Sequence, residues 1–154
     1  MCRLATLDDL DTLCELDEVV FGGPEHSHVD RTGRRQFRYQ LTKAHAEVYL
    51  AELDGDVVGF ATVLMREGST VLRGYSIAIA SNARNMGLAT EFFAWAERRW
   101  IELGFDRASF EVHANNPGAQ RLYSRMGYVI TEQMPDYFDP EDDGVRMVKR
   151  LVSG

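Results

Sequence analysis

The sequence of 154 residues predicts an α/β fold in which helices cover both faces of a mixed central sheet. One observation is the pair Asp54-Gly55, which separates two β-rich runs and is typical of a hairpin turn. The other is that β-rich segments alternate with segments of helical periodicity after this hairpin. A hairpin pairs its strands antiparallel and a strand–helix–strand unit pairs them parallel, so a mixed sheet is expected.

The first elements are expected to be helices. Thr6-Leu7-Asp8-Asp9 has the Thr-x-x-acid form that caps a helix start. In the helix that follows, one face collects apolar side chains, namely Leu10, Leu13, Cys14, Val20 and Phe21. Asp17 lies on this same face, where an apolar residue is expected. A second helix is expected over residues 32–44, because Phe37 and Leu41 stand four positions apart.

Strands are expected next. Residues 48–53 and 57–64 form the two arms of the hairpin, and residues 71–79 form a further strand. Gly74 interrupts this last run, which predicts either a β-bulge or a close approach of another group to the backbone.

In the second half of the chain, expected helices alternate with expected strands. A long amphipathic helix is expected over residues 88–103, then a short strand over 108–112 and a short helix over 117–126. Closing strands are expected over 128–134 and 145–152. We expect an acidic loop between them, which contains Asp136, Asp139, Glu141, Asp142 and Asp143.

The amino-acid composition and charge exclude several classes of function. The net charge is −7, which argues against a nucleic-acid partner because phosphate backbones select basic surfaces. Acidic side chains suit an amine-bearing or basic partner, although most acidic surfaces only keep a protein soluble. No apolar run reaches the roughly 20 residues that a membrane-spanning helix needs. Acidic residues occur too close to the N-terminal methionine for a signal peptide. With only Cys2 and Cys14, we expect a reduced, cytoplasmic protein without a cysteine metal cluster.

An anion-binding turn is predicted where residues 75–80 lead through Ser81-Asn82-Ala83 into the long helix. A strand-to-helix turn of small residues points backbone N–H groups at one place, and the helix N-terminus adds about half a positive charge. Gly87 and Ala89 leave space for a phosphate to approach the backbone. The alternative is an ordinary turn whose glycine relieves strain. A mononucleotide site is less favoured, because neither a Walker loop nor a Gly-x-Gly-x-x-Gly motif is present.

The segment Arg84-x-x-Gly87-x-Ala89 resembles the Arg/Gln-x-x-Gly-x-Gly/Ala signature by which GNAT N-acetyltransferases hold the pyrophosphate of acetyl-CoA. Further downstream, the chain resembles the family's Leu-Glu-Val-Arg-x-x-Asn-x-x-Ala-x-x-Leu-Tyr-x-x-x-Gly-Phe block in the segments Phe110-Glu111-Val112-His113-Ala114-Asn115-Asn116-Pro117-Gly118-Ala119, Leu122-Tyr123-Ser124 and Met126-Gly127-Tyr128. This form is typical of the ribosomal-protein-alanine branch, which modifies protein N-terminal amines. The resemblance is strongest from Tyr75 to Tyr128.

The resemblance implies a single N-acetyltransferase domain over residues 1–154, with acetyl-CoA held in a V-shaped opening between the fourth and fifth strands of the fold. It implies that Glu111 is the general base and Tyr123 the general acid. The cofactor-binding residues that it implies are Ile77, Ala78, Ile79, Arg84, Asn85, Met86, Gly87, Leu88, Ala89, Thr90 and Asn116. Asn85 and Met86 depart from the family pattern, which more often carries glycine or a basic residue there. His113 replaces the usual arginine.

The chemistry suits these residue types. Lysine amines, with a pKa near ~10.4, and α-amino groups, near ~8, are protonated at neutral pH, so a base must remove a proton before attack. A phenol can donate a proton to the departing thiolate. Two alternatives stay open: Glu111 alternates with Phe110 and Val112 and would then face solvent, and Tyr123 would then be a packing residue.

We therefore expect direct transfer of an acetyl group to a protein or peptide amine, in a ternary complex without an acyl-enzyme. A small amine such as an amino acid, polyamine or antibiotic is the alternative acceptor, and a non-catalytic acyl-CoA sensor is the alternative function. No metal is expected, and His26 and His28 are interpreted as polar loop residues. Asp17, Phe21 and residues 136–138 are candidate acceptor contacts. The oligomeric state stays open.

Overall fold

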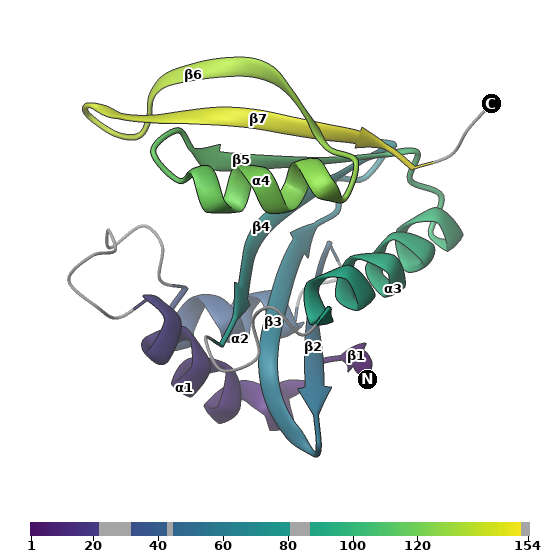
Figure 1. The fold of residues 1–154 in the computed structure, drawn as a ribbon. Coiled ribbons are helices and arrows are strands. Elements are labelled where there is room, and N and C mark those ends of the chain that lie inside the picture. Colours follow the sequence, from purple (N-terminus) through teal and green to yellow (C-terminus); the bar gives the residue numbers. More distant parts are fainter. Residues whose placement is uncertain (22–31, 43–44, 81–86, 152–154) are drawn as a thin grey trace.

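The computed structural model describes residues 1–21, 32–42, 45–80 and 87–151. A seven-stranded sheet in the order β1-β2-β3-β4-β5-β7-β6 runs through the molecule (Figure 1). Its strands are β1 (Cys2–Leu4), β2 (Ala46–Leu53), β3 (Asp56–Leu64), β4 (Val71–Ile79), β5 (Arg107–His113), β6 (Val129–Asp139) and β7 (Asp142–Arg150). The helices are α1 (Leu10–Phe21), α2 (Arg34–Thr42), α3 (Leu88–Glu102) and α4 (Pro117–Arg125), with a short 3-10 helix η1 (Leu7–Asp9) before α1.

The predicted α/β fold is confirmed, because apolar side chains bury on both faces of the sheet. Helices α3 and α4 cover one face, where Trp100, Phe93 and Tyr123 pack on alternate strand residues. Helices α1 and α2 cover the other face over β2 to β4, where the Phe37 ring meets the Phe60 ring edge-on at 5.3 Å. Burial of each such side chain contributes about 1.5–3 kcal/mol.

The sheet opens at its centre. Strands β4 and β5 form the parallel pair, and all other pairings are antiparallel. They pair only from Val71 with Arg107 to Arg73 with Ser109, and beyond that point they diverge. The predicted opening between two central strands is therefore present. A second predicted feature lies beside it: the register shift between β3 and β4 leaves Tyr75 as the extra residue of a bulge after Gly74.

The acid on the apolar face of α1 has a structural explanation. Asp17 is 1% exposed, and its carboxylate accepts hydrogen bonds from the backbone N–H groups of Thr32 and Gly33 at 3.1 Å. These N–H groups lie immediately before α2 and have no helical acceptor of their own. Asp17 therefore ties the start of α2 to α1, and both of its oxygens are engaged by the backbone.

The prediction of an acidic loop between the closing strands is wrong, because the acidic residues extend those two strands. Strand β6 runs to Asp139 and β7 begins at Asp142, with an irregularity in pairing between Met134 and Asp139. At the irregularity, acidic side chains accept hydrogen bonds in place of the backbone hydrogen bonds that regular strand pairing would supply. The Asp136 N–H, for example, donates to the Asp143 carboxylate at 2.8 Å. Asp136 also takes a left-handed backbone with φ of 55°, which aspartate tolerates better than most residues. Acids that indicate a loop by composition here stabilise a bulged hairpin.

The helices of the described residues are amphipathic and moderate in length. None of them combines the length and the apolar character that a membrane-crossing helix requires.

Candidate active site

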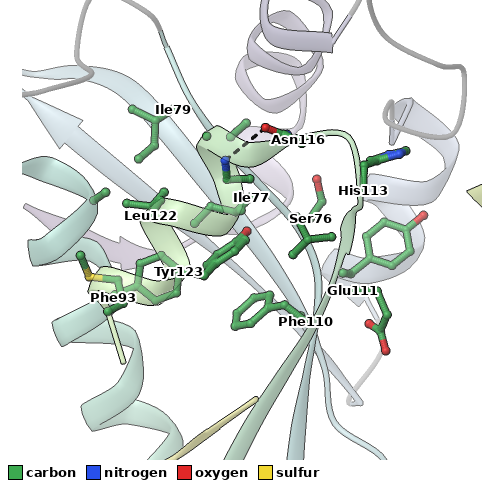
Figure 2. A pocket seen from close by; sticks show the side chains of 18 of the residues that line it. Ser76, Ile77, Ile79, Phe93, Phe110, Glu111, His113, Asn116, Leu122 and Tyr123 are labelled. Carbon is green, nitrogen blue, oxygen red and sulfur yellow. Dashed lines mark hydrogen bonds between the residues drawn. The ribbon is translucent and has the colours of Figure 1, made fainter. Parts of the chain in front are cut away.

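A cleft of about 1460 Å³ occupies the opening between β4 and β5 (Figure 2). Its walls come from β4 and β5, the first turns of α3, the inner face of α4, the end of α1 and the outer part of β6. Every predicted catalytic or cofactor-binding residue that the structure describes lines it, namely Ile77, Ala78, Ile79, Gly87, Leu88, Ala89, Thr90, Glu111, Asn116 and Tyr123. Of the candidate acceptor contacts, Phe21, Tyr137 and Phe138 line the cleft, whereas Asp17 and Asp136 do not. Arg84, Asn85 and Met86, like His26 and His28, lie outside the described residues.

Strand β4 turns alternate backbone groups toward the opening. The Ala80 N–H donates to the Val58 carbonyl of the β3 side at 2.7 Å. Peptide groups alternate in direction along a strand, so Ala78 also faces β3, whereas Ile77 and Ile79 point their N–H and C=O groups toward β5. Because β5 has diverged there, this edge of β4 suits the amide groups of an extended ligand such as a pantetheine arm.

The N-terminus of α3 meets the cleft at Gly87. Gly87 is the N-cap and has a left-handed φ of 72°, and a Cβ placed on it would meet no atom within 4 Å. The N–H groups of the first helical turn have no helical acceptor, and the 15-residue helix adds a partial positive charge. Leu88 is buried and anchors this turn, while Ala89 and Thr90 line the cleft. Open space, donors and positive potential together fit a pyrophosphate.

We expect Gly87→Glu to weaken CoA binding roughly 100-fold or more, because its carboxylate would repel a phosphate about 5 Å away. Gly87→Ala is the matched control, since any side chain there carries the same left-handed strain of about 1–2 kcal/mol without a charge. Calorimetric titration with CoA and melting curves on both variants check this expectation. Equal CoA affinity of the two folded variants would contradict a phosphate site at Gly87.

Asn116 lies at the start of α4, where its role is partly structural. Its side-chain oxygen accepts a hydrogen bond from the Ala119 N–H at 3.1 Å and so caps the helix (Figure 2). The capping bond orients the side chain at the rim of the cleft, with the amide nitrogen as its donor group.

Tyr123 forms part of the apolar wall on the α4 side. Its ring stacks on Phe110 with ring centres 5.1 Å apart and meets the edge of Phe93 at 5.6 Å. Figure 2 shows the phenol oxygen pointing to the side on which Ile77 lies. Burial raises the pKa of Tyr123 above its ordinary value, so the hydroxyl keeps its proton throughout the neutral range.

Glu111 lies on the opposite face of β5 from Phe110, and Figure 2 shows its carboxylate directed away from Tyr123. It is not the solvent-facing side chain of the alternative interpretation, because the Glu111 side chain is only 10% exposed. The carboxylate accepts hydrogen bonds from the Arg73 guanidinium at 3.2 Å and from the Arg146 guanidinium at 3.3 Å. Two cations from neighbouring strands therefore compensate its charge.

Sequence reasoning identified neither Tyr75 nor the surroundings of His113 as part of the site. Tyr75 lines the cleft because the bulge after Gly74 turns it there, and burial raises its pKa. Gly74 was the feature of the sequence that could have indicated this bulge. The His113 ring stacks on Phe138 with ring centres 3.7 Å apart, and it bonds to Asp142 of the closing hairpin. No spacing along the chain indicates that contact.

In the described part of the chain, no three histidine, cysteine, aspartate or glutamate side chains form a group able to hold a metal ion.

A family model described as "Acetyltransferase (GNAT) family" matches residues 10–128. The chain belongs to this family.

Similar proteins agree with the family. A Methanocaldococcus jannaschii protein named as an uncharacterized N-acetyltransferase is 30% identical, over 66% of this chain and 65% of its own length, so the chain spans less than two thirds of that relative. An N-alpha-acetyltransferase of Sulfurisphaera tokodaii is 24% identical over 97% of this chain and 92% of its own.

Two solved structures share the fold. The ribosomal-protein-S18-alanine N-acetyltransferase of Escherichia coli superimposes with a TM-score of 0.80 at 16% identity, over 100% of this chain and 96% of its own. An aminoglycoside 6'-N-acetyltransferase complexed with coenzyme A superimposes with a TM-score of 0.82 at 12% identity, over 100% and 98%. The neighbours therefore include enzymes with protein and with small-molecule acceptors, and the fold is common to both.

Proposed function

We propose that this protein transfers the acetyl group of acetyl-CoA directly to a primary amine of a protein or peptide, with an N-terminal α-amino group as the preferred acceptor. The observation that carries the proposal is the continuity of the cleft. One cavity reaches from Gly87 and Thr90 at the α3 N-terminus to Phe21, Tyr137 and Phe138 on the other side of the sheet. Two substrates that enter from opposite sides meet between β4 and β5.

The donor half of the cleft suits CoA. Acetyl-CoA supplies the acetyl group as a thioester. The first turn of α3 binds the pyrophosphate through backbone N–H groups, and the edge of β4 at Ile77 and Ile79 pairs with the pantetheine amides. Tyr123 donates a proton to the thiolate as it departs. Neither Cys2 nor Cys14 lines the cleft, which supports direct transfer over an acyl-enzyme on cysteine.

The acceptor half holds the base. Glu111 draws the proton from the acceptor ammonium, directly or through one water, so that the neutral amine attacks. An α-amino group, with an ordinary pKa near ~8, is easier to deprotonate than a lysine side chain near ~10.4. The S. tokodaii relative is named for activity on an α-amino group, which supports the same preference.

A thiol-release assay with acetyl-CoA and three kinds of acceptor tests the proposal. The first is a lysine-free peptide with a free N-terminus, the second the same peptide with a blocked N-terminus and one added lysine, and the third a polyamine or an aminoglycoside. We expect release mainly with the first peptide, and mass spectrometry should locate the acetyl group on its α-amino nitrogen. Release confined to small amines would overturn the peptide assignment. CoA binding without release for any amine would leave only a ligand-binding function.

A further inference from the structure

Part of the cleft lies between α3 and α4. Helix α3 lines this part with Thr90, Ala94 and Glu97, and α4 lines it with Leu122 and Arg125. Residues three or four positions apart share one face of a helix. Each helix therefore contributes one wall to this part of the cleft, which we call the helix groove.

The last turn of α4 packs near the start of α3. The ring of Phe93 on α3 meets the rings of Tyr123 and Tyr128 edge-on, with ring centres 5.6 and 5.8 Å apart. Phe93 is six residues after Gly87, which is about 9 Å along the helix axis. Arg125 comes between the two tyrosines in the sequence and lines the cleft. It therefore lies beside the second turn of α3, a short distance beyond the pyrophosphate region.

Arg125 differs in its contacts from the other basic side chains of the cleft. Of the described residues, three arginine or lysine side chains line the cleft, namely Arg73, Arg125 and Lys149. The Arg73 guanidinium bonds to Glu111 at 3.2 Å. The Lys149 ammonium bonds to Glu97 at 2.7 Å. Arg125 is exposed, and within the described part of the chain its guanidinium has no hydrogen-bonding or ion-pair partner.

The ligand of the proposed function carries an anion that the pyrophosphate site leaves unbound. Coenzyme A has a third phosphate, on the 3′ oxygen of its ribose, and a phosphate monoester carries about −1.5 to −2 charges at pH 7. The ribose follows the pyrophosphate on the side away from the pantetheine arm. Because the arm occupies the opening between β4 and β5, the helix groove is the part of the donor half that remains for the ribose. In a protein of net charge −7, a cation at this place offsets the general repulsion of an anion.

We propose that Arg125 binds the 3′-phosphate of CoA and so makes the enzyme distinguish CoA from dephospho-CoA. This inference rests on the proposed function. A guanidinium donates two parallel N–H bonds to the oxygens of one phosphate, which makes arginine well suited to this ligand. Arg125 also stands in the last turn of α4, where a cation stabilises the helix C-terminus by itself. Only the first role depends on the third phosphate of the ligand.

Calorimetric titration with CoA and with dephospho-CoA, which lacks only the 3′-phosphate, tests the proposal at one fixed ionic strength. The dissociation constant for dephospho-CoA should exceed that for CoA about 10-fold in wild type, whereas the two should be about equal in Arg125→Gln. Arg125→Lys should give an intermediate ratio, because an ammonium keeps the charge without the fork. The matched control is Arg121→Gln, which removes the same charge from an exposed position of α4 that does not line the cleft. It should keep the wild-type ratio.

The ratio of the two dissociation constants separates the possible outcomes, and melting curves show which variants are folded. Equal binding of both ligands by wild type would overturn the role of Arg125 while the proposed function stands. A folded Arg125→Gln with the wild-type ratio would also overturn it and leave only the contribution to the helix C-terminus. An equal loss of the ratio in Arg121→Gln would show a general effect of charge instead of a contact. Failure of wild type to bind either ligand would overturn the proposed function itself.

Discussion

We expect Tyr123→Phe to lower kcat about 100-fold while CoA affinity stays within a few-fold of wild type, because the substitution removes one oxygen and keeps the stacked ring. In the proposed mechanism the phenol acts only in the transition state, where negative charge develops on the departing sulfur, so the expected loss belongs to kcat. Burial raises the pKa of Tyr123, which makes the phenol a weak acid, and a thiolate leaves fairly well without help. We therefore expect the lower end of the usual range for acid catalysis.

The matched control is Tyr128→Phe, in the same aromatic cluster. Tyr128 is 1% exposed and does not line the cleft, and its hydroxyl donates to Glu97 at 3.0 Å. Its loss should cost about 1 kcal/mol of unfolding free energy with little change in kcat. Steady-state kinetics and melting curves on both variants make the comparison. Normal turnover by Tyr123→Phe would remove the general-acid role and leave water as the proton donor.

The second large effect concerns Gly74, whose lack of a side chain makes room for Phe110. A Cβ at Gly74 would overlap two carbons of the Phe110 ring. Phe110 cannot simply retreat, because it stacks on Tyr123 and meets Trp100 and Tyr128 on its other sides. We expect Gly74→Ala to cost about 3 kcal/mol of unfolding free energy, the upper part of the range for overpacking. A displaced Phe110 also shifts Tyr123, so kcat should fall in the protein that remains folded.

A double-mutant cycle isolates this clash. Phe110→Ala by itself should cost about 3–5 kcal/mol, because it empties the centre of the aromatic cluster. The double variant should be more stable than the sum of the two losses predicts, by about 1–3 kcal/mol, because the new methyl group then occupies vacated space. Gly118→Ala is the control for stability, since its Cβ would meet only Asn116, at 3.7 Å. Additive losses in chemical denaturation would show that Gly74 acts through its backbone instead.

Local patterns predicted most of the fold because each depends on neighbours along the chain. The capping box at Thr6 and Asp9 is present, with both reciprocal hydrogen bonds. Asp54 and Gly55 take the two left-handed conformations that a tight hairpin turn requires. Strand β1 was missed, because three residues are too few to show a period. The hairpin of β6 and β7 was only partly predicted, because its acidic residues satisfy backbone groups that composition cannot reveal.

Local sequence patterns also cannot predict the order of the strands in the sheet. Strand β7 inserts between β5 and β6, although β6 precedes it in the chain. This insertion brings Arg146 beside Glu111 and Asp142 beside His113. Pairings of this kind join residues about 30 positions apart in the sequence, so no window of a few residues contains them.

The alternation of strands and helices, the turns at Gly55 and Gly87, and the residue types at Glu111 and Tyr123 can be read from the amino-acid sequence, because propensity, backbone conformation and side-chain chemistry are local properties. The surroundings of those side chains depend on the folded arrangement. Glu111 is bonded to two guanidinium groups, Tyr123 is buried against Phe110, and the acid at Asp17 holds the start of α2. Burial and charge compensation depend on contacts between segments that are far apart in the sequence. These segments come close together only in the folded protein.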